Sequence, residues 1–152
     1  MNLSEYIDGE RVILSLSAHD KDSAIREMVG FLDQKKALSD TDSALKALFE
    51  REKLGSTGVG EEIAIPHAKL ASIEDLVIML AFSKGIPFDS ADGKDVRIFF
   101  LLLAPEKQMN LHLKTLAKIS RLVKSTGFKE RVLEAGSVAD VCRILSEEEQ
   151  KL

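Results

Sequence analysis

The chain has 152 residues, a formal net charge of −4, 45% hydrophobic residues and 30% charged residues, the balance of one globular domain spanning residues 1–152. Its Lys and Arg residues are scattered, and its apolar runs are too short to cross a bilayer as helices, which argues against nucleic-acid-binding and membrane-inserted proteins. Residues 1–9 lack the pattern of a signal peptide and Cys142 is the only cysteine, so we expect a cytoplasmic protein without an intramolecular disulfide.

Two helices are predicted after a short first strand at residues 12–14. Asp20 or Asp22 can cap the first helix, because a carboxylate accepts hydrogen bonds from free backbone N–H groups. Apolar residues recur in this helix at helical spacing, at Ile25, Met28, Val29 and Leu32. Residues 39–42 offer caps for the second helix, which we expect to end at Gly55.

Three strands are predicted in the middle of the chain. Residues 63–65 form a short strand that we expect to stop at Pro66, which has no backbone N–H to donate to a ladder. Residues 76–82 and 96–103 are nearly continuous apolar runs rich in Val, Ile and Phe, a pattern typical of strands buried on both faces. Residues 55–60, which precede these strands, are predicted to form a flexible loop.

Helical spacing returns in the last third of the chain. It predicts a helix at residues 113–123 and a shorter one at residues 128–133. A last helix is expected to begin at Ser137, where Ser137-x-x-Asp140 resembles a capping box. Helices before and after the strands predict an α/β fold in which helices cover both faces of a central sheet.

The segment between the second helix and Pro66 carries the residues most suited to chemistry. Its glycine-rich loop contains Gly55, Ser56, Thr57, Gly58 and Gly60. Glycine N–H groups can approach an anion closely, and the two hydroxyl groups add hydrogen-bond donors. Arg51 offers a planar fork that matches phosphate, and His67 offers a nucleophilic nitrogen in its neutral form. These groups suit phosphoryl transfer, provided that one ring nitrogen is held as a donor.

Structural interpretations of the same residues stay open on pattern alone. Arg51 lies in the last turn of a predicted helix, where a basic residue interacts favourably with the helix dipole. His67 after a proline can be an ordinary surface histidine. The loop lacks the Gly-Lys-Ser/Thr of a nucleotide P-loop and does not follow a strand as a dinucleotide fingerprint does. His19, His67 and His112 lack the spacing of a metal-ligand set, so no metal site is predicted.

The run from Arg51 to Gly60, followed by Ile65-Pro66-His67-Ala68-Lys69, resembles the signature of a known family. This family is the fructose/mannitol-type enzyme IIA domain of the bacterial phosphoenolpyruvate:sugar phosphotransferase system (PTS). Residues 88–105 and 112–120 resemble two further family segments in the same order, so the resemblance covers nearly the whole chain. It is closest to the nitrogen-regulatory branch. Glu61-Glu62 and Asp95 depart from the common pattern at positions that border the motifs.

The resemblance implies a mixed sheet sandwiched by helices and a phosphohistidine relay. Family members accept a phosphoryl group from the phosphocarrier HPr, or its nitrogen-branch counterpart NPr, on a histidine that matches His67. An arginine matching Arg51 and a second histidine matching His112 lie near the phosphoryl group. The nitrogen farther from the main chain is the acceptor. No nucleotide, metal or other cofactor is implied, because the donor is already a high-energy phosphoprotein.

Three functions are compatible with the sequence. The first is a nitrogen-type regulatory phosphoprotein, whose phosphorylation state is read by regulatory partners. The second is the separate IIA component of a fructose- or mannitol-type permease, which passes the phosphoryl group to an enzyme IIB cysteine. The third is an anion-binding module that forms no covalent adduct. The identity of any sugar and of the downstream partner is not encoded in a recognisable pattern.

A protein donor sets a condition on the surface around His67. It must bring its own phosphohistidine in line with the acceptor, so we expect His67 in a shallow depression on an apolar surface. Val59, Ile63 and Ile86 are the predicted ring around it. Cys142 is expected to pack in the apolar stripe of the last helix rather than to accept a phosphoryl group.

Overall fold

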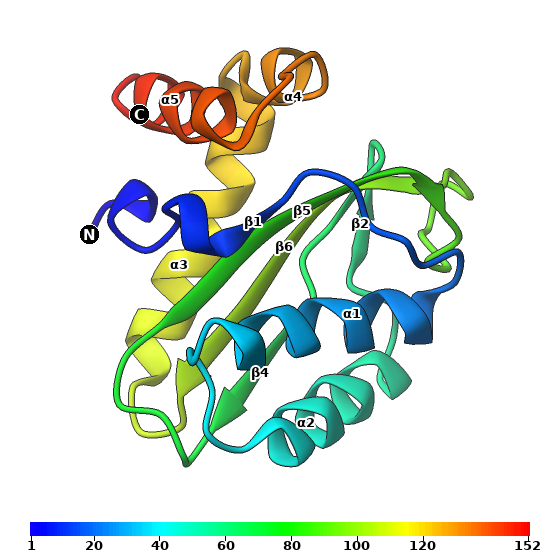
Figure 1. The fold of residues 1–152 in the computed structure, drawn as a ribbon, viewed down its shortest axis with the longest axis vertical. Helices are drawn as coiled ribbons and strands as arrows, with labels where there is room; N and C mark the ends of the chain where they lie inside the picture. The colour runs from blue at the N-terminus through cyan, green and yellow to red at the C-terminus, as the bar shows by residue number, and fades with distance from the viewer.

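A six-stranded mixed sheet runs through the molecule, with helices on both of its faces (Figure 1). The computed structural model describes all residues, from Met1 to Leu152. The strands are β1 (Val12–Ile13), β2 (Gly58–Gly60), β3 (Ile63–Ala64), β4 (His67–Leu70), β5 (Val77–Ile86) and β6 (Val96–Pro105). Their order is β1-β5-β6-β3-β2, and β4 pairs with β6 farther along the edge that β3 occupies. The β5–β6 and β2–β3 pairs are antiparallel and the other pairs are parallel.

The helices form one layer on each face of this sheet. They are α1 (Lys21–Gln34), α2 (Thr41–Lys53), α3 (Met109–Ser125), α4 (Phe128–Val132) and α5 (Val138–Glu149), with short 3₁₀ helices at Leu3–Glu5 and Gly9–Arg11. Figure 1 shows α1 and α2 on one face and α3 crossing the other, with α5 beside the N-terminus. This arrangement confirms the predicted α/β class. None of these helices is both long enough and apolar enough to span a membrane.

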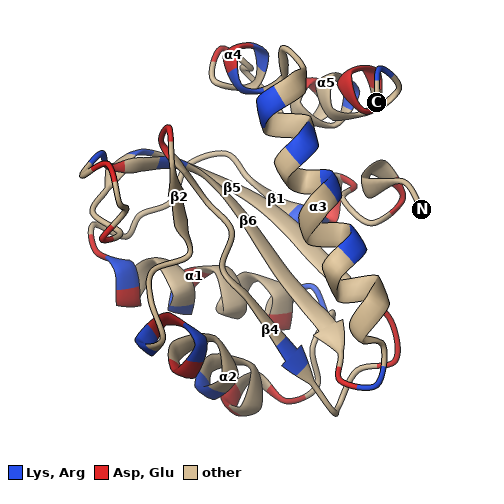
Figure 2. Ribbon diagram, turned by 180° about the vertical axis from the view of Figure 1, so that it is seen from behind, with Lys and Arg blue, Asp and Glu red and all other residues tan.

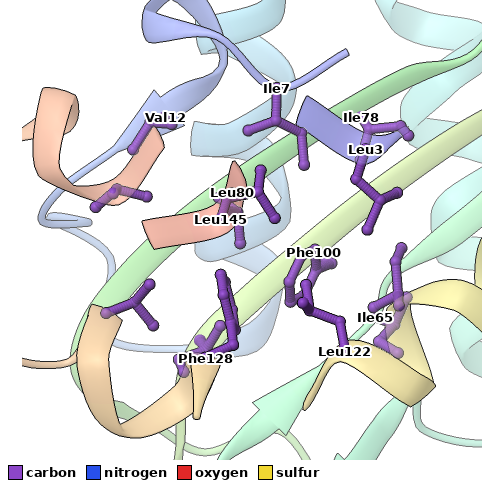
Figure 3. Close-up of a cluster of buried hydrophobic side chains, with 14 of the residues drawn as sticks. Leu3, Ile7, Val12, Ile65, Ile78, Leu80, Phe100, Leu122, Phe128 and Leu145 are labelled. Atoms are coloured by element: carbon purple, nitrogen blue, oxygen red, sulfur yellow. The ribbon is translucent and has the colours of Figure 1, made fainter. Parts of the chain in front are cut away.

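The two long strands supply a hydrophobic core on each face. Side chains alternate along a strand, and here both sets are apolar. Along β6, Phe100 and Leu102 pack on the side of α3 and α5, whereas Phe99 and Leu101 pack on the side of α1 and α2. Figure 3 shows the first of these clusters, in which Phe100 lies among side chains of the sheet and of the helices that cover this face, such as Leu122 and Leu145. Burying each such side chain contributes roughly 1.5–3 kcal/mol. Strands β5 and β6 are therefore buried on both faces, as predicted.

Side-chain caps fix where three helices begin. Asp20 accepts a hydrogen bond from the Ser23 N–H at 2.8 Å, and Asp40 accepts one from the Ser43 N–H at 3.0 Å. Ser137 accepts from the Asp140 N–H at 3.1 Å and starts α5. The predicted caps are therefore confirmed, with Asp20 rather than Asp22 capping α1. Helix α2 ends at Lys53, just before Gly55, which adopts a φ of 141°.

The chain around Pro66 differs from the prediction in two places. Strand β3 ends at Ala64, before Pro66 as predicted, but a strand that was not predicted, β4, begins at His67 and continues the pairing with β6 in the same register, Ala64 with Phe99 and His67 with Leu102. Pro66 removes one donor from the ladder, but its carbonyl still accepts the Leu102 N–H at 2.9 Å. The predicted flexible loop at residues 55–60 also ends in a strand, β2, which pairs with β3.

Candidate active site

His67 opens β4 at an edge of the sheet. Strand β4 pairs only with β6, so its other edge is open. Ala68 and Leu70 point into the core beneath α1 and α2, and alternation along the strand therefore places His67 and Lys69 on the face that α3 covers. Arg51 reaches this edge from the last turn of α2, and His112 reaches it from the first turn of α3. The fold thus brings together the three residues selected from the sequence.

Hydrogen bonds at both ring nitrogens hold His67. Its Nδ1 lies 2.7 Å from the carbonyl oxygen of Ile65, and its Nε2 lies 3.3 Å from the Nε of Arg51. A carbonyl only accepts and a guanidinium only donates, so these partners assign the proton to Nδ1 and the lone pair to Nε2. The ring is half-buried. This arrangement presents Nε2, the nitrogen farther from the main chain, as the nucleophile.

His112 forms the opposite wall of the site. Its ring lies edge-on to that of His67, with centroids 5.3 Å apart and planes at 79°. The residue is only 4% exposed, and its Nδ1 has no hydrogen-bond partner. It sits at the N-terminus of α3, where free backbone N–H groups carry partial positive charge. An anion beside His67 would meet this helix end.

Burial keeps both rings neutral. It lowers the pKa of His67 below its ordinary value of 6.5, and the Arg51 guanidinium acts in the same direction. The Ile65 carbonyl and the Glu52 carboxylate oppose this shift without cancelling it. Burial also lowers the pKa of His112, with further contributions from His67 and Lys69. A neutral His67 near pH 7 retains the lone pair that a nucleophile needs.

The glycine-rich loop forms hydrogen bonds with neighbouring segments of the chain. The Gly55 carbonyl accepts a hydrogen bond from Arg51 Nη1 at 2.8 Å and orients the guanidinium. The Ser56 hydroxyl donates to the Phe88 carbonyl, and the Thr57 hydroxyl donates to the Glu52 carboxylate. A side chain at Gly58 would collide with the Ser90 hydroxyl group. In this structure the loop therefore positions Arg51, while its two hydroxyl groups already have partners.

Lys69 and the Ile65 carbonyl belong to the site and were missed from the sequence. The Lys69 Nζ lies 3.5 Å from the sulfur of Met109 at the start of α3. Strand alternation two residues after His67 would have identified it, but the strand was predicted to stop at Pro66. The Ile65 carbonyl carries no side-chain signal. Figure 2 shows the basic bands of α3, a helix without acidic residues.

The predicted apolar ring around His67 was largely wrong. Ile63 is 2% exposed and Ile86 is 1% exposed, because both belong to the core, and only Val59 reaches the surface. Three other large apolar side chains are exposed on segments that build the site. They are Leu54 beside Gly55, Met109 against Lys69, and Leu113 next to His112.

Cys142, the other nucleophile considered, lies outside this site. It packs on α5 against the core, with its sulfur 3.9 Å from the Ile7 carbonyl. Burial raises the pKa of its thiol, which disfavours the reactive thiolate. The prediction that it packs as a hydrophobe is confirmed. His, Cys, Asp and Glu side chains form no group of three that could hold a metal ion.

Comparison with known proteins places the chain in one family. Residues 5–148 match the family described as "Phosphoenolpyruvate-dependent sugar phosphotransferase system, EIIA 2". The chain therefore belongs to the IIA proteins of the PTS, as the motifs around Arg51, His67 and His112 indicated.

Relatives of two kinds are similar to the chain. A nitrogen regulatory protein of Bradyrhizobium diazoefficiens is 33% identical over 151 residues, covering 96% of this chain and 95% of that protein. The fructose-specific EIIABC component of Bacillus subtilis is also 33% identical over 151 residues, covering 99% of this chain but 24% of that protein. The crystal structure of IIA-Ntr from Neisseria meningitidis matches with a TM-score of 0.86 and 30% identity, over 94% of this chain and 98% of that chain.

Proposed function

We propose that the protein is a phosphoryl carrier of the PTS, in which Nε2 of His67 accepts a phosphoryl group from phosphorylated HPr or NPr. The observation that carries this proposal is the state of the His67 ring. The Ile65 carbonyl holds the proton on Nδ1, and the lone pair of Nε2 is directed to the side where Arg51 lies. A histidine prepared in this way is a nucleophile that needs no further base.

The transfer itself balances without any cofactor. The Nε2 lone pair forms a bond to phosphorus while the phosphorus–nitrogen bond of the donor's phosphohistidine breaks. The donor nitrogen keeps the electron pair of that bond, and the proton on Nδ1 of His67 stays at the Ile65 carbonyl. The Arg51 guanidinium and the N-terminus of α3 at His112 stabilise the phosphoryl oxygens. The protein thus acts as a phosphotransferase component that accepts a phosphoryl group from one protein and passes it to another.

The surface around His67 supports a protein as donor and as recipient. The ring is half-buried at an open strand edge, which leaves Nε2 within reach of an incoming group. Leu54, Met109 and Leu113 are exposed on the surrounding segments. Exposed apolar side chains beside a reactive group are typical of a protein-docking surface.

We favour a regulatory, nitrogen-type role for this carrier, in which partner proteins read the phosphorylation state of His67. The similarity to nitrogen regulatory proteins extends over nearly the full length of both chains. The alternative is a IIA component that hands the phosphoryl group to a cysteine of enzyme IIB, and the equal identity to the fructose-specific relative supports it. Transfer from the phosphorylated protein to a purified IIB domain distinguishes the two roles.

Intact-mass measurement tests the carrier proposal. The protein is incubated with phosphoenolpyruvate, enzyme I and either HPr or NPr, and we expect the mass to increase by one phosphoryl group. The adduct should be acid-labile and absent in His67→Ala. An unchanged mass of the wild type would contradict the carrier function and favour an anion-binding module. An acid-labile adduct on His67→Ala would show that another residue is the acceptor.

A further inference from the structure

We propose that Glu52 is a positioning residue that holds both Arg51 and His67 in the geometry for phosphoryl transfer, an inference that rests on the proposed carrier function. Glu52 does not touch the reacting nitrogen. It binds Thr57 of the glycine-rich loop. The loop in turn positions the Gly55 carbonyl, which binds Arg51, and the Ile65 residue, which binds His67.

The Glu52 carboxylate is buried among polar groups. Its side chain is 6% exposed, and it accepts hydrogen bonds from the backbone N–H of Thr57 at 3.1 Å and from the Thr57 hydroxyl. The Nζ of Lys21, at the start of α1, lies 2.9 Å from the same carboxylate and 4.8 Å from the centre of the Phe88 ring. Lys21 and the two donors of Thr57 thus give the buried carboxylate hydrogen-bond and ion-pair partners.

A short chain of hydrogen bonds connects the Glu52 carboxylate to His67. Thr57, held by Glu52, accepts the Ile65 N–H on its carbonyl oxygen at 3.0 Å. Ile65 in turn accepts the Nδ1 proton of His67 at 2.7 Å. Thr57 therefore fixes the residue whose carbonyl selects the tautomer of the nucleophile.

The same loop also sets the direction of Arg51. Arg51 Nη1 donates to the carbonyl of Gly55, two residues before Thr57, while Arg51 Nε donates to His67 Nε2. Because Arg51 and Glu52 are adjacent in the last turn of α2, the same end of this helix binds the loop at Gly55 and at Thr57. A displacement of the loop would move the guanidinium and the Ile65 carbonyl together.

Charge gives Glu52 a second, measurable effect on His67. The carboxylate favours the protonated ring, whereas burial and Arg51 favour the neutral ring. His112 is the other titratable group beside the His67 ring, and Lys69 acts on His112. Removing the charge of Glu52 should therefore lower the pKa of His67 further, an effect that a loss of packing alone would not produce.

The experiment compares Glu52→Gln, Thr57→Val and Thr57→Ser with the wild type. Glu52→Gln removes the charge, Thr57→Val removes only the hydroxyl donor, and Thr57→Ser restores that donor. The matched control is Glu27→Gln, since Glu27 also accepts backbone N–H bonds, from Ser17 and Ala18, in another part of the fold. Phosphorylation rates are measured with enzyme I and HPr, and nitrogen NMR of the imidazole gives the tautomer and pKa of His67.

We expect Glu52→Gln to phosphorylate 10- to 100-fold more slowly, since misplacing reacting groups by about 1 Å costs on the order of 10²-fold. Thr57→Val should slow transfer in the same direction, and Thr57→Ser and Glu27→Gln should stay near the wild-type rate. The nitrogen spectra of Glu52→Gln should show a lower His67 pKa and a mixture of tautomers. Should Glu52→Gln fail to fold, Thr57→Val carries the rate and tautomer tests, because it removes a hydrogen bond of Glu52 without removing the charge.

Two outcomes separate failure of this proposal from failure of the carrier function. If Glu52→Gln, or Thr57→Val in its place, transfers within twofold of the wild type and leaves the His67 tautomer unchanged, Glu52 has no positioning role. If the wild type itself accepts no phosphoryl group, the carrier function is wrong. If Glu52→Gln and Glu27→Gln slow phosphorylation equally, Glu52 has a structural role only.

Discussion

A histidine that accepts a phosphoryl group must keep one nitrogen unprotonated while the other holds its proton. At His67 a backbone carbonyl performs the second task, and the first is favoured by burial and by Arg51. The same arginine that favours the neutral ring can then bind the phosphoryl oxygens, because its planar guanidinium matches phosphate geometry. In the proposed transfer, Arg51 therefore acts on the His67 ring before phosphorylation and on the phosphoryl group after it.

Burial of the two neutral histidines should make the stability of the fold depend on pH. The pKa values of His67 and His112 are lowered in the folded protein, so the unfolded chain binds more protons below about pH 6.5. The free energy of unfolding should therefore fall as the pH decreases from 7.5 to 5.5. Urea unfolding of the wild type and His112→Gln measures this, and the variant should lose less stability over that range. An equal loss in both proteins would assign the dependence to other groups.

At the residue scale, the sequence identified side chains but not their partners. Arg51, His67 and His112 could be selected because Arg and His have chemistry of their own. The Ile65 carbonyl could not be selected, because every residue has one. Glu52 stood next to Arg51 in the sequence, but its bonds to Thr57 and Lys21 depend on how the loop folds back onto α2.

The elements differ in how far local sequence determines them. Helices α1, α2 and α5 begin at capping side chains that the sequence displays, and β5 and β6 are long apolar runs. Strands β2, β3 and β4 have two to four residues each, and they form because β6 and each other supply the hydrogen-bond partners. Such short strands have no periodicity of their own, so the sequence could not locate β2 or β4.

The turn between β2 and β3 offers a test at this scale. Its two residues, Glu61 and Glu62, have φ values of 57° and 69°, which suit Asn or Gly better than Glu. Glu61 is exposed. Its backbone N–H donates a hydrogen bond to the Asp92 carboxylate, and any non-proline residue can supply this donor. We expect Glu61→Asn to raise the free energy of unfolding by about 0.5–1 kcal/mol, measured by urea unfolding.

Glu61→Ala is the control for this substitution, because it removes the same charge but keeps an ordinary Cβ at a positive φ. It should be no more stable than the wild type. If alanine and asparagine stabilise the protein equally, repulsion between the neighbouring carboxylates rather than backbone strain would explain the gain.

Residues from both helical layers meet at the open edge of β4. Arg51 comes from the layer of α1 and α2, His112 comes from the opposite layer, and His67 lies on the sheet between them. The sequence pattern predicted both layers, and the family resemblance implied that Arg51 and His112 lie near His67. Strand β4, whose open edge carries His67, was not predicted. An edge position makes a residue reachable by a large partner, and a site for protein-to-protein transfer needs that access.

Docking at this edge can be tested with two exposed leucines. Leu113, 56% exposed, follows His112, whereas Leu14, 39% exposed, lies just after β1 at the opposite side of the sheet order. Leu113→Asp should raise the phospho-HPr concentration that gives half-maximal transfer about tenfold, because loss of one apolar docking contact costs about 1.4 kcal/mol. Leu14→Asp, with the same change in charge, should leave that concentration unchanged. Equal effects of both substitutions would mean that net charge, rather than contact beside His67, governs the encounter.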